Sequence, residues 1–208
     1  MVPKDKWKIN PQKTAFVVID LQNTYVHPGA PLEVSGARNF IPRLNEAARV
    51  CRKLGMPVIH TYHTSNTDLS DAGILQEIRP RTSSELEAVD GRRGVALYET
   101  LEVLDTDYVL RKIRYSAFIP GSSTIEPLLR GLGRDSIIIG GVLTDVCVAT
   151  TAQDAMMLGF KVFYVADFTA TLSEERQKIT LEVLDRHFVK VISFPELMKE
   201  LGSLLPYR

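Results

Sequence analysis

This sequence of 208 residues has few cysteines, no net charge and no long apolar run, and each absence excludes a class of protein. Two cysteines, Cys51 and Cys147, are too few for a disulfide framework and favour a reducing compartment. With 25 basic and 25 acidic residues, the chain has no overall positive charge that would attract nucleic acid or an anionic membrane. No apolar run approaches the length of a membrane span, and the first residues lack the apolar core of a signal peptide. We therefore expect a cytoplasmic protein that binds neither nucleic acid nor membrane.

What the sequence does contain is a regular alternation of strand and helix patterns. Continuous apolar runs such as 15–20 are typical of strands that are buried on both faces of a parallel sheet. Amphipathic stretches such as 38–54 predict helices that cover such a sheet. The predicted strands are 15–20, 57–63, 107–115, 137–139, 161–167 and 188–193, and the predicted helices are 38–54, 124–132, 144–159, 173–187 and 195–204. This alternation predicts an α/β fold, a three-layer α/β/α sandwich around a mainly parallel sheet of about six strands.

The remaining segments divide into an arm and loops. Residues 1–14 read as an N-terminal arm, and residues 15–208 as a single domain. The segment that follows Asp20 is rich in turn-forming residues and predicts a loop. Residues 64–96 are polar and weakly periodic, and an excursion of this length usually forms a lid or binding loop. Its arginines could bind an anion, although a solvated surface is the preferred interpretation for most of them: Arg79, Arg81, Arg92 and Arg93.

Three chemically useful residues fall at the carboxyl ends of predicted strands. Asp20 ends the first strand, Lys112 lies near the end of the third, and Cys147 follows the fourth. Ligands in open parallel sheets bind at this edge. Thr144 is a predicted N-cap, which places Cys147 in a first helical turn where a thiolate is favoured. Each residue also has a purely structural alternative. Asp20 could be a carboxylate that caps a loop, Lys112 a charge at the edge of a strand, and Cys147 a buried core residue. Because all three fall at the same edge of the sheet, a catalytic role is favoured over these structural alternatives.

The three residues together suit acyl transfer through a thioester. Asp20 is a candidate base for the Cys147 thiol, and Lys112 could stabilise either charge. The backbone N–H groups of Leu143 and Cys147 could form an oxyanion hole. Cys51, in contrast, lies on the apolar stripe of the helix at 38–54 and is predicted to belong to the core.

Other constellations in the sequence are weaker. A GxGxxG fingerprint and a Walker A loop are both absent, so no cofactor is predicted. His60 and His63 lie near the end of the second strand, with Asp68 and Asp71 nearby, but no recognisable ligand spacing appears and no metal is predicted. His63 is instead predicted to line the pocket.

Three motifs, VIDLQN around Asp20, VLRKIRYSAF around Lys112 and GGVLTDVCV around Cys147, closely resemble those of isochorismatase-like cysteine hydrolases. These include nicotinamidases, N-carbamoylsarcosine amidases, ureidoacrylate amidohydrolases and biuret hydrolases. The resemblance implies a catalytic triad of Asp20, Lys112 and Cys147. It also implies a cis peptide between Val142 and Leu143, which would aim the Leu143 N–H into the oxyanion hole. The candidate substrate-binding residues are Tyr25, His63, Tyr115 and Thr144.

The resemblance also narrows the reaction. The isochorismatases proper, which cleave a vinyl ether, lack the cysteine, so Cys147 favours C–N hydrolysis with release of ammonia. Nicotinamidases carry a metal site that begins D-x-H, and this chain has HTYHTSNTD there, which favours the metal-free ureido or carbamoyl branch. A nicotinamidase-type amidase, a vinyl-ether hydrolase and a non-catalytic scaffold subunit stay open as alternatives. The resemblance further implies a homo-oligomer, a dimer or tetramer.

Overall fold

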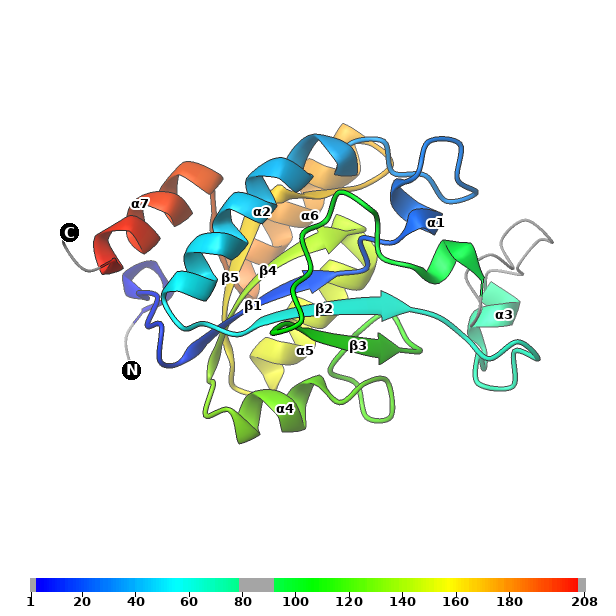
Figure 1. The fold of residues 1–208 in the computed structure, drawn as a ribbon, viewed down its shortest axis with the longest axis horizontal. Helices are drawn as coiled ribbons and strands as arrows, with labels where there is room; N and C mark the ends of the chain where they lie inside the picture. Colours follow the sequence, from blue (N-terminus) through cyan, green and yellow to red (C-terminus); the bar gives the residue numbers. More distant parts are fainter. Residues whose placement is uncertain (1–2, 79–91, 206–208) are drawn as a thin grey trace.

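The computed structural model describes residues 3–78 and 92–205, which contain a six-stranded sheet with parallel neighbours throughout. The spatial order is β3-β2-β1-β4-β5-β6, so the chain begins near the middle, moves out to β3 and returns to β4 (Figure 1). The order therefore reverses between β1 and β4, and such switch points are where ligands bind in open parallel sheets. The strands are β1 (Thr14–Ile19), β2 (Val58–His63), β3 (Tyr108–Lys112), β4 (Ser136–Val142), β5 (Lys161–Ala170) and β6 (Lys190–Ile192).

Helices cover both faces of this sheet. One apolar cluster contains residues of α2 and α7, and the other contains residues of α4, α5 and α6 (Figure 1). The predicted three-layer sandwich is therefore confirmed. None of the helices in the described ranges is long and apolar enough to cross a membrane. The helices are α1 (Asn23–Val26), α2 (Ala37–Lys53), α3 (Leu75–Ile78), α4 (Ile125–Gly131), α5 (Ala149–Met157), α6 (Glu174–His187) and α7 (Phe194–Leu204).

The central strand β1 shows why the sequence has continuous apolar runs. Phe16 and Val18 pack into the cluster on the side of α2 and α7, whereas Val17 and Ile19 pack into the cluster on the other side. All residues of β1 are buried, because successive side chains of a strand point to opposite faces and both faces are covered. This packing fixes the backbone at Ile19, immediately before Asp20.

Several local predictions are corrected or confirmed by the structure. The predicted loop after Asp20 contains the short helix α1. Strand β3 ends at Lys112 rather than at residue 115, and β5 continues to Ala170. Ser173 caps α6 as predicted, because its side chain accepts a hydrogen bond from the backbone N–H of Arg176.

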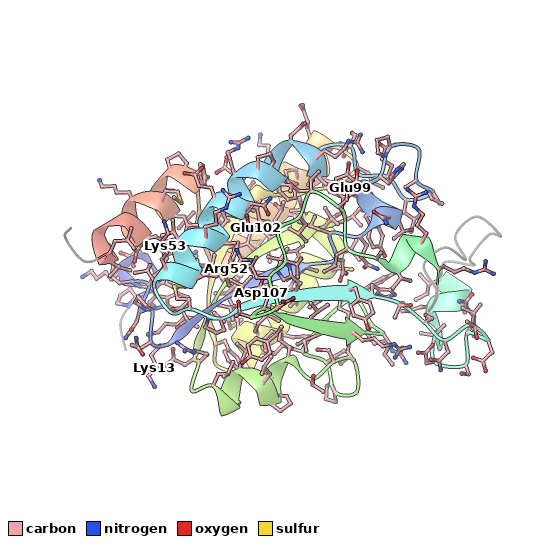
Figure 2. The ribbon with its side chains drawn as sticks, viewed as in Figure 1. Lys13, Arg52, Lys53, Glu99, Glu102 and Asp107 are labelled. Atoms are coloured by element: carbon pink, nitrogen blue, oxygen red, sulfur yellow. The ribbon has the colours of Figure 1, made fainter. Side chains whose placement is uncertain are left out.

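A charge cluster fixes the segment that leads into β3. Arg52, near the end of α2, places Nε 3.0 Å from Oδ1 of Asp107 and Nη2 2.6 Å from Oδ2. Its Nη1 also donates to Glu102 Oε1 at 2.8 Å, and these side chains lie together between α2 and the start of β3 (Figure 2). Burial would raise the pKa of Asp107, but hydrogen bonds from His60 and Arg52 outweigh it and hold this pKa well below its usual range.

The replacement Asp107→Asn should lower the free energy of unfolding at neutral pH by about 2–3 kcal/mol, since the charge of Arg52 would lose a partner. The pKa of Asp107 is depressed in the folded protein, so its contribution is present above its ordinary pKa of 3.8 and is lost as the pH falls below that value. Urea unfolding of both proteins over a pH series measures this. The difference between them should shrink in acid, and a difference that grows there would contradict the assignment.

Candidate active site

Asp20, Lys112 and Cys147 meet at the carboxyl edge of the sheet. Asp20 follows β1, Lys112 ends β3, and Cys147 lies in the turn after β4. Lys112 Nζ lies 2.8 Å from Asp20 Oδ2, and neither side chain is exposed. Both groups lie close enough to the Cys147 thiol to shift its pKa, Lys112 downwards and Asp20 upwards. The structure thus gathers a thiol, a carboxylate and an ammonium in one buried cluster.

The backbone and the side chain of Asp20 are both held tightly. Its φ of +54° lies in the left-handed region, which aspartate tolerates better than most residues. Its Oδ1 accepts a hydrogen bond from Thr61 Oγ1 at 2.8 Å. Its Oδ2 faces the ammonium of Lys112, 2.8 Å from Nζ. A carboxylate has more lone pairs than these two contacts use, so Asp20 can still take a proton.

Lys112 reaches the cluster from β3 as an ammonium. Its Nζ donates to the carbonyl oxygen of Arg114 at 2.9 Å and lies 3.3 Å from Nδ1 of His63. Burial would lower the pKa of Lys112, but the charge of Asp20 beside it outweighs burial and raises this pKa above its ordinary value. The lysine therefore stays charged at neutral pH.

Cys147 holds its proton in the free protein. Burial raises the pKa of the thiol to about 12, Lys112 opposes this increase, and Asp20 adds to it. We expected the helix start to favour a thiolate, and that expectation is wrong for the free protein because burial outweighs the effect of Lys112. The thiol consequently needs a base before it can act as a nucleophile. Cys51 has a similarly raised pKa, and its predicted place in the core is confirmed.

The turn that carries Cys147 differs from a regular helix start. The peptide bond between Val142 and Leu143 is cis, and Thr144–Val148 form a π-helical turn that leads into α5. Leu143 occupies the N-cap position, so the predicted N-cap role of Thr144 is wrong. Thr144 Oγ1 donates instead to Gln177 Oε1 of α6 at 2.5 Å. The turn is therefore held from α6, by a side chain far along the sequence.

The other candidate substrate-binding residues lie in different surroundings. The His63 ring contacts Lys112 and lies 6.3 Å, between ring centroids, from the half-buried Tyr115. Tyr25, in α1, is buried in the apolar cluster on the side of α2 and α7. The structure thus brings His63 and Tyr115 to the lysine of the cluster, and substrate contact by any of these residues stays a prediction.

The residues considered for metal or anion binding do not converge. His60 faces Asp107 whereas His63 faces Lys112, as expected for side chains on opposite faces of β2. Over residues 3–78 and 92–205, no three His, Cys, Asp or Glu side chains gather as a metal site would require. Arg92 and Arg93 are exposed. Arg79 and Arg81 lie outside the described residues.

Gln22 is a buried residue of the site to which the sequence analysis assigned no role. Its Nε2 donates to the carbonyl oxygens of His63 and Val95, both at 3.0 Å, and its Oε1 accepts from the His63 N–H at 2.7 Å. One amide thereby joins the two ends of the excursion at residues 64–96. The only signal in the sequence was a polar residue inside the VIDLQN motif.

Comparison with known proteins shows the family to which the chain belongs. A ureidoacrylate amidohydrolase from Caulobacter segnis is 29% identical, with 95% of this chain and 90% of that protein aligned. Nicotinamidase 3 from Arabidopsis thaliana is 28% identical, with 92% and 90% aligned. The crystal structure of a cysteine hydrolase from Pseudomonas syringae pv. phaseolicola 1448A superposes with a TM-score of 0.89 at 25% identity and covers 96% of this chain and 97% of that one. The isochorismatase domain matches residues 14–196, and the chain therefore belongs to the isochorismatase domain family.

Proposed function

We propose that this protein is a cysteine-dependent amidohydrolase that cleaves the C–N bond of a small amide, ureido or carbamoyl compound and releases ammonia. The observation that carries the proposal is the ion pair of Asp20 and Lys112 at 2.8 Å, buried beside the thiol of Cys147. A carboxylate alone would raise the pKa of a buried thiol, and a lysine alone would leave no base. The two together supply a base and a cation to the same sulfur.

The first half of the reaction forms the thioester. Asp20 Oδ2 takes the thiol proton as the Cys147 sulfur attacks the substrate carbonyl carbon, and the ammonium of Lys112 stabilises the thiolate as it forms. The N–H groups of Leu143 and Cys147 receive the oxyanion. Asp20 then returns its proton to the leaving nitrogen, which departs as ammonia while the carbonyl re-forms on sulfur.

The second half removes the acyl group. Water gives a proton to Asp20 and adds to the thioester carbonyl, and the same N–H groups hold the second oxyanion. When the C–S bond breaks, the sulfur of Cys147 recovers its proton from Asp20. The acid or carbamate leaves and the starting state returns. Because each proton moves between Cys147, Asp20 and the substrate, the charge of Lys112 is unchanged throughout.

The ureido or carbamoyl branch is the first candidate for the substrate class. The D-x-H sequence that opens the nicotinamidase metal site is absent. The side chains of His60 and His63 lie on opposite faces of β2. Similarity to a ureidoacrylate amidohydrolase supports this branch. A nicotinamidase-type amidase is the second candidate, because nicotinamidase 3 aligns with the chain to nearly the same extent.

An ammonia-release screen tests the substrate class. The panel should contain ureidoacrylate, N-carbamoyl amino acids, biuret, maleamate and nicotinamide. We expect a kcat/KM for a ureido or carbamoyl compound at least about 10-fold above that for nicotinamide. The reverse order would assign the protein to the nicotinamidase type.

Intact-mass spectrometry of the stopped reaction tests the covalent step. Turnover of the preferred amide should leave an acyl group on Cys147. A vinyl-ether hydrolase that used Asp20 as an acid would form no such adduct, and a scaffold subunit would show neither the adduct nor ammonia.

A further inference from the structure

The ammonium of Lys112 is surrounded by acceptors. Its three N–H donors have Asp20 Oδ2 at 2.8 Å, the carbonyl oxygen of Arg114 at 2.9 Å and Nδ1 of His63 at 3.3 Å. Since an ammonium has no lone pair, Nδ1 of His63 is the acceptor in this contact. His63 is 4% exposed, so this contact lies inside the protein.

The position of this ammonium matters for the thiol. Lys112 extends from β3, and β2 lies between β3 and β1, which leads to Asp20. A flexible side chain that bridges this gap can place its charge in several positions, and the attraction between a cation and a thiolate falls with distance. His63, which is paired with Lys112 in the register of β2 and β3, supplies the contact on the side of β2.

His63 is itself held on its backbone. The Gln22 amide accepts from the His63 N–H at 2.7 Å and donates to the His63 carbonyl oxygen at 3.0 Å, so one side chain binds both polar groups of this residue. Gln22 has no exposed surface. The ring of Tyr115 lies against the His63 ring. Backbone and ring are therefore both restrained.

We infer that His63 is a positioning residue that acts on Cys147 through Lys112, and that Gln22 holds His63 in this place. The inference rests on the proposed function, and it differs from the prediction that His63 contacts the substrate. A residue that contacts only substrate affects KM. A residue that orients Lys112 affects the reactivity of the Cys147 sulfur before any substrate is bound.

The test is the rate at which iodoacetamide modifies Cys147, followed by peptide mass spectrometry without substrate. His63→Leu should lower this rate about 10-fold, because Lys112 loses an acceptor and its charge moves away from the sulfur. His63→Asn should restore it to within about 3-fold of the wild type, because the asparagine Oδ1 can replace Nδ1 as acceptor. His187→Leu, the same change on an exposed residue of α6, is the matched control and should react as the wild type does.

Kinetics with the preferred amide complete the test. His63→Leu should lower kcat about 10-fold while KM changes less than about 3-fold. Gln22→Met, which keeps the shape but lacks the amide, should slow alkylation in the same direction. If His63→Leu is alkylated at the wild-type rate and has a raised KM, the positioning role is overturned. The proposed function is not overturned by that result, because it depends on ammonia release by the wild type. A wild type that releases no ammonia from any amide would overturn the proposed function, whereas slower alkylation of His63→Leu would still support the positioning role.

Discussion

Replacing Cys147 by alanine should abolish ammonia release, with kcat at least about 10⁴-fold below the wild type. The reason is that no other described group can replace the sulfur. The ion pair of Asp20 and Lys112 at 2.8 Å supplies a base and a cation but no nucleophile that could carry the acyl group, and a water in the place of the thiol would have to attack an amide without forming a thioester. Ammonia release under saturating substrate is the measurement.

Cys51→Ala provides the matched control. Cys51 is the same residue type, is equally buried, and also has its pKa raised to about 12 by burial. It lies, however, in the apolar cluster on the opposite face of the sheet from Cys147. We expect kcat within about 2-fold of the wild type, at a cost of about 1–2 kcal/mol in the free energy of unfolding. Wild-type ammonia release by Cys147→Ala would contradict the proposed mechanism.

The sheet and the convergence of Asp20, Lys112 and Cys147 could be predicted because both depend on local patterns. A continuous apolar run such as Ile137–Ile139 identifies a strand that helices cover on both faces, and all three residues are buried. Parallel strands also end at the same edge of the sheet. A residue placed at the end of such a strand is therefore brought to that edge whatever the loops do.

The failed predictions depend on contacts between distant segments. Thr144 has the side chain of a good N-cap, yet Gln177 of α6 engages its hydroxyl, and nothing near Thr144 in the sequence indicates this partner. The raised pKa of Cys147 has the same origin, because burial is a property of the packed structure. Gln22 gave little signal for a related reason, since its partners lie at His63 and Val95.

Gly141→Ala should destabilise the protein by about 4 kcal/mol or more and remove its activity. Gly141 has a φ of +130°, a region that L side chains rarely adopt, and a Cβ added there would lie 2.0 Å from the carbonyl oxygen of Ile19. Ile19 is paired with Gly141 in the register of β1 and β4. The methyl group would therefore separate these strands at the point where one leads to Asp20 and the other to Cys147. Urea unfolding, with ammonia release from the soluble fraction, measures both effects.

Gly202→Ala is the same substitution where the backbone is helical and open. Gly202 lies in α7, and a Cβ added there would meet no other atom within 4 Å. We expect it to raise the free energy of unfolding by about 0.5–1 kcal/mol, because alanine loses less backbone entropy on folding than glycine. The opposite signs of the two changes would separate the close approach at Gly141 from a general effect of replacing glycine. Equal stability of the two variants would instead mean that β1 and β4 can move apart beside Asp20, and the site would then not depend on this contact.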